Sequence, residues 1–314
     1  MISYSQIKAA EKRIRKYIKR TPLEHSIFLS KKCRGEVYLK PENMQVTSSF
    51  KARGALNKVL LLSPARRKNI ITASAGNHAI AVAYACSIVG VVPRIVVPKN
   101  VAQVKLEAIK HYHPKLIIRG RDYDEAEAYA ISLAKKNNYT YISPYNDEKV
   151  IAGQGTIGLE VMREAPDTDM IICPVGGGGL AAGVAIAAKH NKRVFVVGAQ
   201  SDASPAMAVS LHAGTIMHIP LKDSIADGLH GNIVQKSITF PLVKKHLDGM
   251  LLVTEREIKE AIKLMLKHHH IALEGSAAVV VAAVLKHTKL FSRKRIVLVL
   301  TGGNIDLSVL RKAL

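Results

Sequence analysis

Four consecutive glycines are the most distinctive chemical feature of this sequence. The apolar run 172–175 leads into Gly176, Gly177, Gly178 and Gly179, and an alanine-rich segment follows. Without side chains, successive backbone N–H groups can converge on one anion, and the positive end of a helix dipole adds to the attraction. The spacing fits neither a Walker loop nor a dinucleotide-binding loop. We interpret the tetrad as a phosphate-binding loop rather than a flexible turn, because four glycines cost backbone entropy.

A lysine lies at the start of a predicted helix, within the segment 47–55. Serines precede Lys51 where they could cap that helix, and taken alone Lys51 is an ordinary surface lysine. The phosphate-binding loop gives it a second interpretation. A lysine amine can form a Schiff base with an aldehyde that carries a phosphate, and a protein that does so needs both features.

The segment 72–78 also lies where a predicted strand leads into a helix. Its small residues let backbone amides approach a ligand closely, and Ser74 and Asn77 offer side-chain hydrogen bonds. Either side chain could instead cap the helix. His78, taken alone, is more often structural than catalytic.

The last predicted strand ends at a fourth candidate segment, 299–304. Thr301 follows this strand and could offer a neutral hydroxyl to a ring nitrogen. The alternative is a turn followed by a helix cap, which requires no ligand.

Together these segments resemble the motifs of one enzyme family. The likeness is to the serine/threonine dehydratases of the tryptophan-synthase-β-like (fold type II) pyridoxal-phosphate enzymes, and most of all to the short catabolic threonine dehydratases (threonine ammonia-lyases). It covers nearly the whole chain in the expected order. The matching motifs are Ser48-Ser49-Phe50-Lys51, Ser74-Ala75-Gly76-Asn77-His78, the glycine tetrad, Thr301-Gly302-Gly303-Asn304, and the segments 150–160 and 225–228.

The resemblance implies a role for each matched residue. Lys51 would form the Schiff base with pyridoxal 5'-phosphate, and the glycine tetrad would bind the phosphate. Phe50 would lie against the ring, Asn77 would bond the ring hydroxyl, and Thr301 would bond the pyridine nitrogen. The substrate carboxylate would be received by the loop formed by Ser74, Ala75, Gly76, Asn77 and His78.

The implied activity is α,β-elimination from L-threonine, and from L-serine, giving 2-oxobutanoate or pyruvate and ammonia. Lys51, released when the substrate amine replaces it, would act as the base for the α-proton. A threonine cannot hold the ring nitrogen protonated as an aspartate would, which favours prompt loss of the β-hydroxyl. A lyase for 3-hydroxyaspartate or another β-substituted amino acid, or a serine racemase, stays open on the same scaffold.

Some positions depart from the family pattern. Ser48 stands where members usually have glycine, which could disturb the loop before Lys51. Ala75 replaces the serine that racemases use as a second base, so racemisation is disfavoured. Gln200 and Ala206 replace the acids that bind a divalent cation in racemases, so we expect no metal site.

Two further features have structural explanations. Adjacent histidines point in different directions, so His268, His269 and His270 are expected to be structural rather than metal ligands. Glu274 precedes a predicted helix and matches a family glutamate near the cofactor. A carboxylate favoured by the helix dipole is a sufficient alternative.

Alternating strands and helices must position these motifs. The short Ile- and Val-rich runs do not alternate with polar residues, which is typical of parallel strands buried on both faces. Ligands bind beyond the carboxyl ends of such strands. The predicted strands are 37–39, 70–73, 94–97, 116–118, 140–142, 170–174, 194–198 and 295–300. The predicted helices are 7–18, 52–62, 77–88, 101–111, 123–137, 155–163, 180–190, 255–267, 275–285 and 306–312.

We therefore expect two open-sheet α/β domains with the cofactor in the cleft between them. Residues 1–66 and 144–314 would form a large domain that binds pyridoxal phosphate. Residues 67–143 would form a smaller α/β domain inserted into it. Closure of the two domains on the substrate would exclude water.

The net charge is the one abnormal number in the composition. Lysine and arginine number 46 against 24 acidic residues, which gives +22. This invites a nucleic-acid-binding interpretation. Against it, aromatic residues make up only 5 % with no tryptophan, and the basic residues are scattered along the chain. We expect a small-molecule amino-acid substrate and no nucleic acid.

Cysteine usage and hydropathy bear on the compartment. Cys33, Cys86 and Cys173 are far apart, and the start of the chain lacks the apolar core of a signal peptide. The longest apolar stretch, 79–92, is shorter than the roughly 20 residues of a membrane span. We expect a cytoplasmic protein without a membrane partner, and a homodimer or homotetramer.

Overall fold

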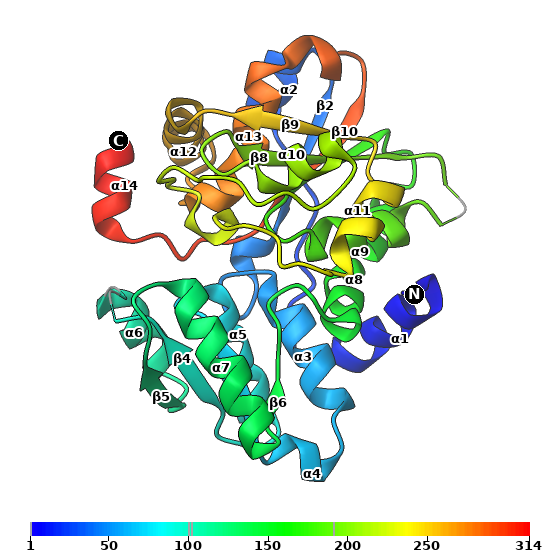
Figure 1. Cartoon of the computed structure of the whole chain (residues 1–314). Helices are drawn as coiled ribbons and strands as arrows, with labels where there is room; N and C mark the ends of the chain where they lie inside the picture. The colour runs from blue at the N-terminus through cyan, green and yellow to red at the C-terminus, as the bar shows by residue number, and fades with distance from the viewer. Residues whose placement is uncertain (1, 100, 102, 191) are drawn as a thin grey trace.

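We describe a computed structural model that covers residues 2–99, 101, 103–190 and 192–314 (Figure 1). The strands are β1 (Glu24–His25), β2 (Glu36–Pro41), β3 (Ile70–Ala73), β4 (Arg94–Val97), β5 (Lys115–Ile118), β6 (Thr140–Tyr141), β7 (Met170–Pro174), β8 (Phe195–Ser201), β9 (Gly249–Val253) and β10 (Arg295–Leu300). The helices are α1 (Tyr4–Ile14), α2 (Ile27–Cys33), α3 (Lys51–Leu61), α4 (Pro64–Arg67), α5 (Asn77–Ile88), α6 (Gln103–Lys110), α7 (Tyr123–Asn137), α8 (Glu148–Glu164), α9 (Gly179–Ala188), α10 (Ala206–Ala213), α11 (Thr239–His246), α12 (Glu255–His269), α13 (Gly275–Lys286) and α14 (Leu307–Ala313). Short 3-10 turns are η1 (Glu42–Met44), η2 (Asp227–Leu229) and η3 (Thr288–Phe291).

The larger sheet has the strand order β1-β2-β10-β7-β8-β9. Its strands pair in parallel, except that β1 runs antiparallel to β2. The register places Ile296 of β10 between Val37 of β2 and Met170 of β7. The sheet therefore joins segments from both ends of the chain.

The smaller sheet has the order β5-β4-β3-β6, and its strands are parallel. These strands all lie between residues 70 and 141, inside the range 67–143 that we expect to form the inserted domain. The mixed α/β class with two sheets is as expected. The exact domain boundaries stay a prediction.

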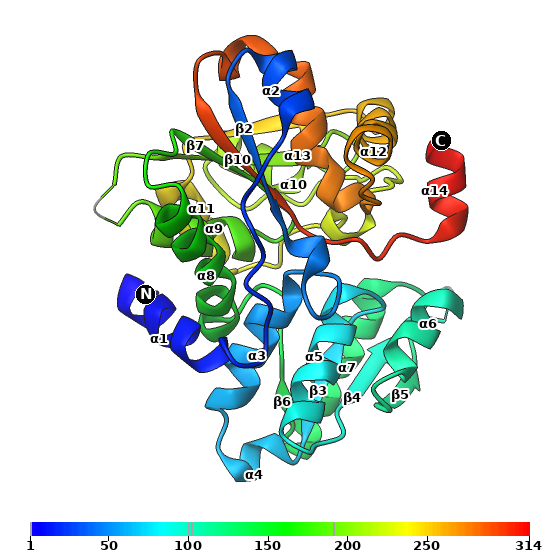
Figure 2. The ribbon, with the colours of Figure 1, turned by 180° about the vertical axis from the view of Figure 1, so that it is seen from behind.

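Helices cover both faces of each sheet, which explains the absence of alternation in the strands. In the smaller sheet, Ile95 and Val97 pack with α5 and α6, whereas Ile71, Ala73 and Val96 pack with α7. Figure 1 shows α7 in front of this sheet. Figure 2, which is seen from the opposite side, shows α5 on the other face. In the larger sheet, α12 and α13 share a core with one face, and α1, α8 and α9 share a core with the other.

Helix α3 lies between the two units. Ala55, Leu56 and Val59 of α3 are buried against α5, whose neighbouring sheet is the smaller one. Val150 of α8 joins the same core, and α8 belongs to the larger unit. The helix that begins with Lys51 is therefore packed between the two units.

Most predicted elements occur within a few residues of their expected bounds, but some were misjudged. The N-terminal helix, expected to reach residue 18, ends at Ile14. The chain turns there, and the backbone of Lys19 then exchanges hydrogen bonds with the Gln45 amide. Strands β1 and β9 and helices α2, α4, α10 and α11 were not predicted, and α8 begins seven residues before the expected start at residue 155. Residue 102, within the predicted helix 101–111, lies outside the described residues.

Candidate active site

The candidate segments lie where parallel strands end. The glycine tetrad follows β7, the 74–76 loop follows β3, and Thr301 follows β10. The backbone N–H of Phe50 donates to Thr301 O at 3.0 Å, and Ser49 and Gly302 form an isolated bridge. Lys51, the first residue of α3, therefore lies beside the carboxyl end of β10, where ligands bind in sheets of this kind.

The Lys51 amine is partly buried in this region. Its Nζ donates to the backbone carbonyl of Pro144 at 2.9 Å and lies 5.1 Å from the centroid of the Phe50 ring. Burial lowers the pKa of Lys51 to about 8, and the nearby Glu274 partly opposes this shift. An appreciable fraction of the amine is then neutral near pH 7, and the neutral amine is the form that acts as a nucleophile or a base.

The glycine tetrad has the conformation and the close contacts that only glycine allows. Gly178 has φ +83°, and Gly179 begins α9. A Cβ on Gly177 would collide with the ring of Tyr145, and one on Gly179 would lie 3.0 Å from Tyr145 O. Because Tyr145 directly follows Pro144, this short segment connects the Lys51 amine to the tetrad.

Thr301 presents a buried hydroxyl at the same place. The residue is 2 % exposed, and its Oγ1 has no hydrogen-bond partner among the described residues. A buried hydroxyl without a partner costs on the order of 1–3 kcal/mol. Such an orphaned group is expected where a ligand supplies the missing partner.

Asn77 is held by two side chains from the larger unit. Its Nδ2 donates to both carboxylate oxygens of Glu274 at 2.9 Å, and its Oδ1 accepts from Asn304 Nδ2 at 2.7 Å. Burial raises the pKa of Glu274 to about 7, although the Asn77 hydrogen bond opposes the shift. Glu274 does stand at the start of α13, yet its carboxylate bonds Asn77 rather than the N–H groups of its own helix.

The predicted substrate loop makes contacts within itself and with its neighbours. Ser74 Oγ accepts from the backbone N–H of Gly76 at 3.2 Å, and Ala75 packs beside the α5–α6 core. His78 Nε2 donates to Ile142 O at 3.1 Å. Burial and then the Lys51 charge lower the pKa of His78 to about 3. His78 is therefore neutral near pH 7, as a structural histidine would be.

Ser48 has a backbone conformation that glycine adopts more readily than serine, and glycine is the residue that the family resemblance leads us to expect at this position. Its φ is +53°, in the left-handed region, and its carbonyl accepts from the backbone N–H of Gly303 at 3.0 Å. A side chain in this region costs roughly 1–2 kcal/mol. The chain accepts this strain, and the loop still reaches the Thr301 segment.

These residues fit pyridoxal phosphate. The glycine tetrad offers backbone N–H groups and a helix N-terminus for the phosphate. The Lys51 amine is available for the aldehyde carbon, and Phe50 supplies an aromatic face next to it. The orphaned Thr301 hydroxyl could donate to a ring nitrogen. The role of each residue toward the cofactor stays a proposal.

Two residues of this region were missed by the sequence analysis. Pro144 supplies the carbonyl that binds the Lys51 amine, and the Tyr145 ring covers Gly177. Both lie two to three residues after the end of the predicted strand 140–142, which ends at the same edge as β3. That position was the signal that could have identified them.

Gln200, which stands at a position expected to hold a cation ligand in racemases, makes hydrogen bonds within the protein. Gln200 Oε1 accepts from the backbone N–H of Ala208 at 3.0 Å, and its amide contacts Ser204 O. Among the residues that the structure describes, no group of three or more His, Cys, Asp or Glu side chains is placed to hold a metal ion. The expectation of no metal stays a prediction.

The histidine run packs against the N-terminal part of the larger unit. His268 stacks on Phe28 with ring centroids 3.9 Å apart, and His269 Nε2 lies 3.0 Å from Ser26 Oγ. His270 takes the left-handed position after α12. These contacts agree with a structural role for the run.

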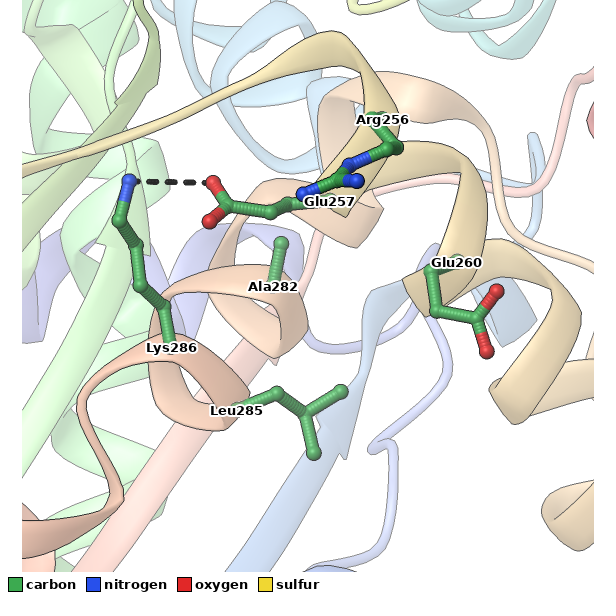
Figure 3. A pocket seen from close by; sticks show the side chains of 6 residues that line it. All are labelled: Arg256, Glu257, Glu260, Ala282, Leu285 and Lys286. Atoms are coloured by element: carbon green, nitrogen blue, oxygen red, sulfur yellow. Dashed lines mark hydrogen bonds and ion pairs between the residues drawn. The ribbon is translucent and has the colours of Figure 1, made fainter.

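A surface pocket of about 430 Å³ lies away from this region (Figure 3). It is bounded by α12 and the C-terminal half of α13, where Lys286 bonds Glu257 at 3.1 Å. Leu285 in its wall is 11 residues along the chain from Glu274, or roughly 16 Å at 1.5 Å per residue. We therefore do not assign the catalytic chemistry to it.

Comparisons with known proteins agree with this description. The model of the family "Pyridoxal-phosphate dependent enzyme" matches residues 14–302. The chain is 41 % identical to the L-threonine ammonia-lyase of Thermotoga maritima, over 99 % of this chain and 77 % of that protein. The processed form of threonine deaminase isoform 2 from Solanum lycopersicum superposes with a TM-score of 0.93 at 34 % identity. The match covers 99 % of this chain and 92 % of that chain. Maize serine racemase superposes with a TM-score of 0.93 at 32 % sequence identity, and the match covers 99 % of this chain and 96 % of that chain. The chain belongs to the family of pyridoxal-phosphate-dependent enzymes of fold type II.

Proposed function

We propose that this protein is a threonine ammonia-lyase that converts L-threonine to 2-oxobutanoate and ammonia, and L-serine to pyruvate and ammonia. The α-proton and the β-hydroxyl leave as water, and the enamine that is released becomes its imine tautomer. The imine then takes up one water molecule and gives the 2-oxo acid and ammonia. The names of the relatives at about 40 % identity support this reaction.

One observation carries the proposal. A partly buried lysine amine with a lowered pKa lies beside an aromatic ring and an orphaned threonine hydroxyl, and the Pro144–Tyr145 segment connects it to a glycine loop at a helix N-terminus. This combination serves a cofactor that has an aldehyde, an aromatic ring and a phosphate. A structural lysine would need none of these neighbours.

The residues divide the work as follows. When bound, pyridoxal phosphate supplies a conjugated ring that accepts the electron pair left on the substrate α-carbon. Lys51 Nζ, whose pKa is about 8, takes the α-proton as a neutral amine. The 74–78 loop would orient the substrate carboxylate through backbone N–H groups other than those of Ser74 and Gly76, which donate to Val96 O and Ser74 Oγ. Thr301 would donate a neutral hydrogen bond to the ring nitrogen, and the glycine tetrad would hold the phosphate.

The first experiment locates the reactive amine. The purified chain is loaded with pyridoxal phosphate, reduced with borohydride and digested, and the modified peptide is identified by mass. We expect the adduct on Lys51. Lys51→Ala should abolish it, whereas Lys58→Ala, on the same helix, should retain it. An adduct on any other lysine would refute the mechanism.

The second experiment separates the reactions open to this scaffold. L-Threonine, L-serine and 3-hydroxyaspartate are supplied in turn, and 2-oxo acids, ammonia and D-serine are measured. We expect 2-oxobutanoate from threonine as the fastest product. Because Ala75 offers only a methyl group where a second base would stand, D-serine should form much more slowly than pyruvate. The reverse ratio would establish a racemase.

The setting of the enzyme is also a proposal. The family resemblance supports a cytoplasmic, catabolic homodimer or homotetramer. None of the helices in the described part of the chain is long and apolar enough to span a membrane. Light scattering after size-exclusion chromatography measures the subunit number.

A further inference from the structure

Four charged side chains are buried beneath the start of α3. They are Lys40, Glu42, Arg53 and Glu160, and they are 0 %, 0 %, 0 % and 4 % exposed. Two cations and two carboxylates balance, but removing each ion from water is costly, and a buried ion cluster is a poor way to gain stability alone. The geometry of the cluster therefore calls for a functional explanation.

Arg53 is the centre of the cluster. Its Nε and Nη2 donate to Glu42 at 2.7 Å each, and its Nη1 and Nη2 donate to Glu160 at 2.6 and 2.9 Å. Nη1 also donates to Thr156 Oγ1 at 3.1 Å. Every N–H of the guanidinium group thus has an acceptor, and the side chain can adopt only one position.

The other members connect Arg53 to the larger unit. Lys40 Nζ, on β2, donates to Glu160 Oε2 at 2.8 Å and to Thr21 O at 2.6 Å. Thr21 Oγ1 donates to Glu42 Oε1 at 2.7 Å. The cluster therefore joins the segment before β1, the strand β2, the turn η1 and the helix α8 to one point on α3.

That point is two residues from the proposed catalytic amine. Lys51 and Arg53 both lie in the first turn of α3. The carbonyl of Arg53 is in close contact with α8, because a Cβ on Gly153 would lie 2.5 Å from it. A cation at a helix N-terminus opposes the helix dipole, so helix formation does not explain Arg53. What Arg53 does is fix the backbone that carries Lys51.

Arg53 and Glu160 each favour the charged form in this environment. Burial opposes the charged form of Arg53, but Glu42 and Glu160 raise its pKa well above the usual value. Burial likewise raises the pKa of Glu160, yet Arg53 and Lys40 lower it by more. The ion pair between Arg53 and Glu160 is therefore favoured in its charged form.

We propose that Arg53 is a positioning residue, which holds the first turn of α3 against β2, η1 and α8 so that the Lys51 amine meets the cofactor and the α-proton in a productive geometry. This inference rests on the proposed role of Lys51. Misplacement of a catalytic group by about 1 Å can cost on the order of 100-fold in rate. A lysine at position 53 keeps the charge but cannot reproduce the two bidentate contacts.

The test compares Arg53→Lys with Lys58→Met. Lys58 lies on the same helix, two turns further on, and pairs with Asp147 at 2.5 Å, so its loss removes an ion pair from α3 without touching the first turn. In cofactor-free protein, visible absorbance follows the rate at which pyridoxal phosphate binds Lys51 covalently. In loaded protein, kcat, KM and the isotope effect with α-deuterated L-threonine are measured. Thermal unfolding is recorded for both.

We expect Arg53→Lys to slow covalent binding and to lower kcat by about 10- to 100-fold, with KM changed less than about threefold. The isotope effect on kcat should rise, because proton removal becomes slower relative to the other steps. Lys58→Met should keep the wild-type values, even if it lowers the unfolding temperature as much. Equal behaviour of the two variants would overturn the proposal.

A second variant guards against failure of Arg53→Lys to fold. Glu42→Gln keeps the shape of the cluster and the Arg53–Glu160 contacts, and a smaller change in the same direction is expected. A folded Glu42→Gln protein with a wild-type covalent-binding rate and isotope effect would also overturn the inference. If wild-type protein binds pyridoxal phosphate at Lys51 but makes no 2-oxobutanoate, the proposed reaction fails, and the covalent-binding rate still tests Arg53.

Discussion

Thr301 carries a buried hydroxyl without a hydrogen-bond partner among the described residues. Its removal should therefore change the stability of the cofactor-free protein and its affinity for the cofactor in opposite directions. Thr301→Val has nearly the same shape and removes the hydroxyl. The cofactor-free variant should be more stable to unfolding than the wild type by about 1 kcal/mol, because an unsatisfied polar group is lost. Its affinity for pyridoxal phosphate should fall. Denaturant unfolding of the cofactor-free protein and equilibrium dialysis measure the two effects.

The two effects in Thr301→Val have opposite signs, which distinguishes a ligand-binding hydroxyl from a structural one. Thr301→Ser restores the hydroxyl and should recover cofactor affinity. A loss of stability in the cofactor-free Thr301→Val protein would show that the hydroxyl has a partner in the free protein.

Glu274 predicts a pH dependence of stability in the cofactor-free protein. Its folded-state pKa, about 7, is above the ordinary 4.5, so the folded state binds the proton more tightly than the unfolded state. The stabilisation is fully present below about pH 4.5 and is lost as the pH rises to about 7. Glu274→Gln cannot undergo this loss. Its stability relative to wild type should therefore increase across this window, by at most roughly 3 kcal/mol.

The same variant has a second readout at Lys51. Glu274 raises the pKa of Lys51, so in Glu274→Gln that pKa should fall further below its present value of about 8. The pH midpoint for covalent binding of pyridoxal phosphate should move down accordingly. Glu260→Gln, at an exposed position of α12, is the control for loss of one negative charge. A midpoint that stays in place would contradict the assignment.

At the scale of elements, the close packing of α8 on α9 positions the glycine tetrad. A Cβ on Gly183 of α9 would lie 2.5 Å from Ile151 O and 2.8 Å from Gly155 N, both on α8. The tetrad immediately precedes α9, so any displacement of this helix moves the proposed phosphate site. The glycines of these helices are thus required by backbone contact rather than by flexibility.

Gly183→Ala should therefore destabilise the protein and weaken cofactor binding. Overpacking costs typically 1–3 kcal/mol, which offsets the gain of about 1 kcal/mol in helix propensity. Calorimetry and a cofactor titration measure the two losses. Gly249→Ala is the control, since nothing lies within 4 Å of a Cβ there. An unchanged Kd for the cofactor in Gly183→Ala would show that α9 does not set the geometry of the tetrad.

At the scale of the whole molecule, an ion pair connects the two sheet units. Nζ of Lys105, on α6, lies 2.5 Å from Oδ2 of Asp227, on η2. The two side chains are 35 % and 55 % exposed, respectively. Such exposed pairs contribute about 0–1 kcal/mol and weaken in salt. The pair therefore contributes little to holding the two units together.

Lys105→Met and Asp227→Asn, alone and combined, should show a coupling energy below about 1 kcal/mol that disappears in high salt. Hydrogen exchange in α6 and η2 should accelerate in each variant. Lys189 and Asp248 form a comparable pair within the larger unit, and loss of that pair should leave α6 unchanged. Exchange in α6 that responds equally to both pairs would contradict a contact specific to the two units.

The +22 charge has a limited meaning at this scale. The proposed site is built from glycines, small residues and neutral hydroxyls, with Lys51 and Glu274 as its charged groups, so the charge excess is not itself the function. A positive field could still draw in an anionic cofactor and a carboxylate substrate. Such steering would show as a rate of cofactor uptake that falls with ionic strength.

The sequence by itself determined the local features of this protein. Strand and helix alternation, the glycine tetrad and the helix that starts at Lys51 depend on residues a few positions apart, and short-range sterics and hydrogen bonding decide them. The bounds of β3, β4, β7, β10 and α5 agree with the predicted ranges for this reason. Resemblance to a family then supplied the cofactor and the candidate residues.

Only the tertiary structure decided which distant residues meet. Strand β2 pairs with β10 although some 250 residues separate them, and Asn77 bonds Glu274 across 197 positions. The Tyr145 ring against Gly177 and the carboxylates around Arg53 likewise depend on how helices and strands pack, which no local pattern encodes. Burial at these meeting points shifts the pKa values of Lys51 and Glu274, because loss of water is a property of the packed molecule and not of the residue.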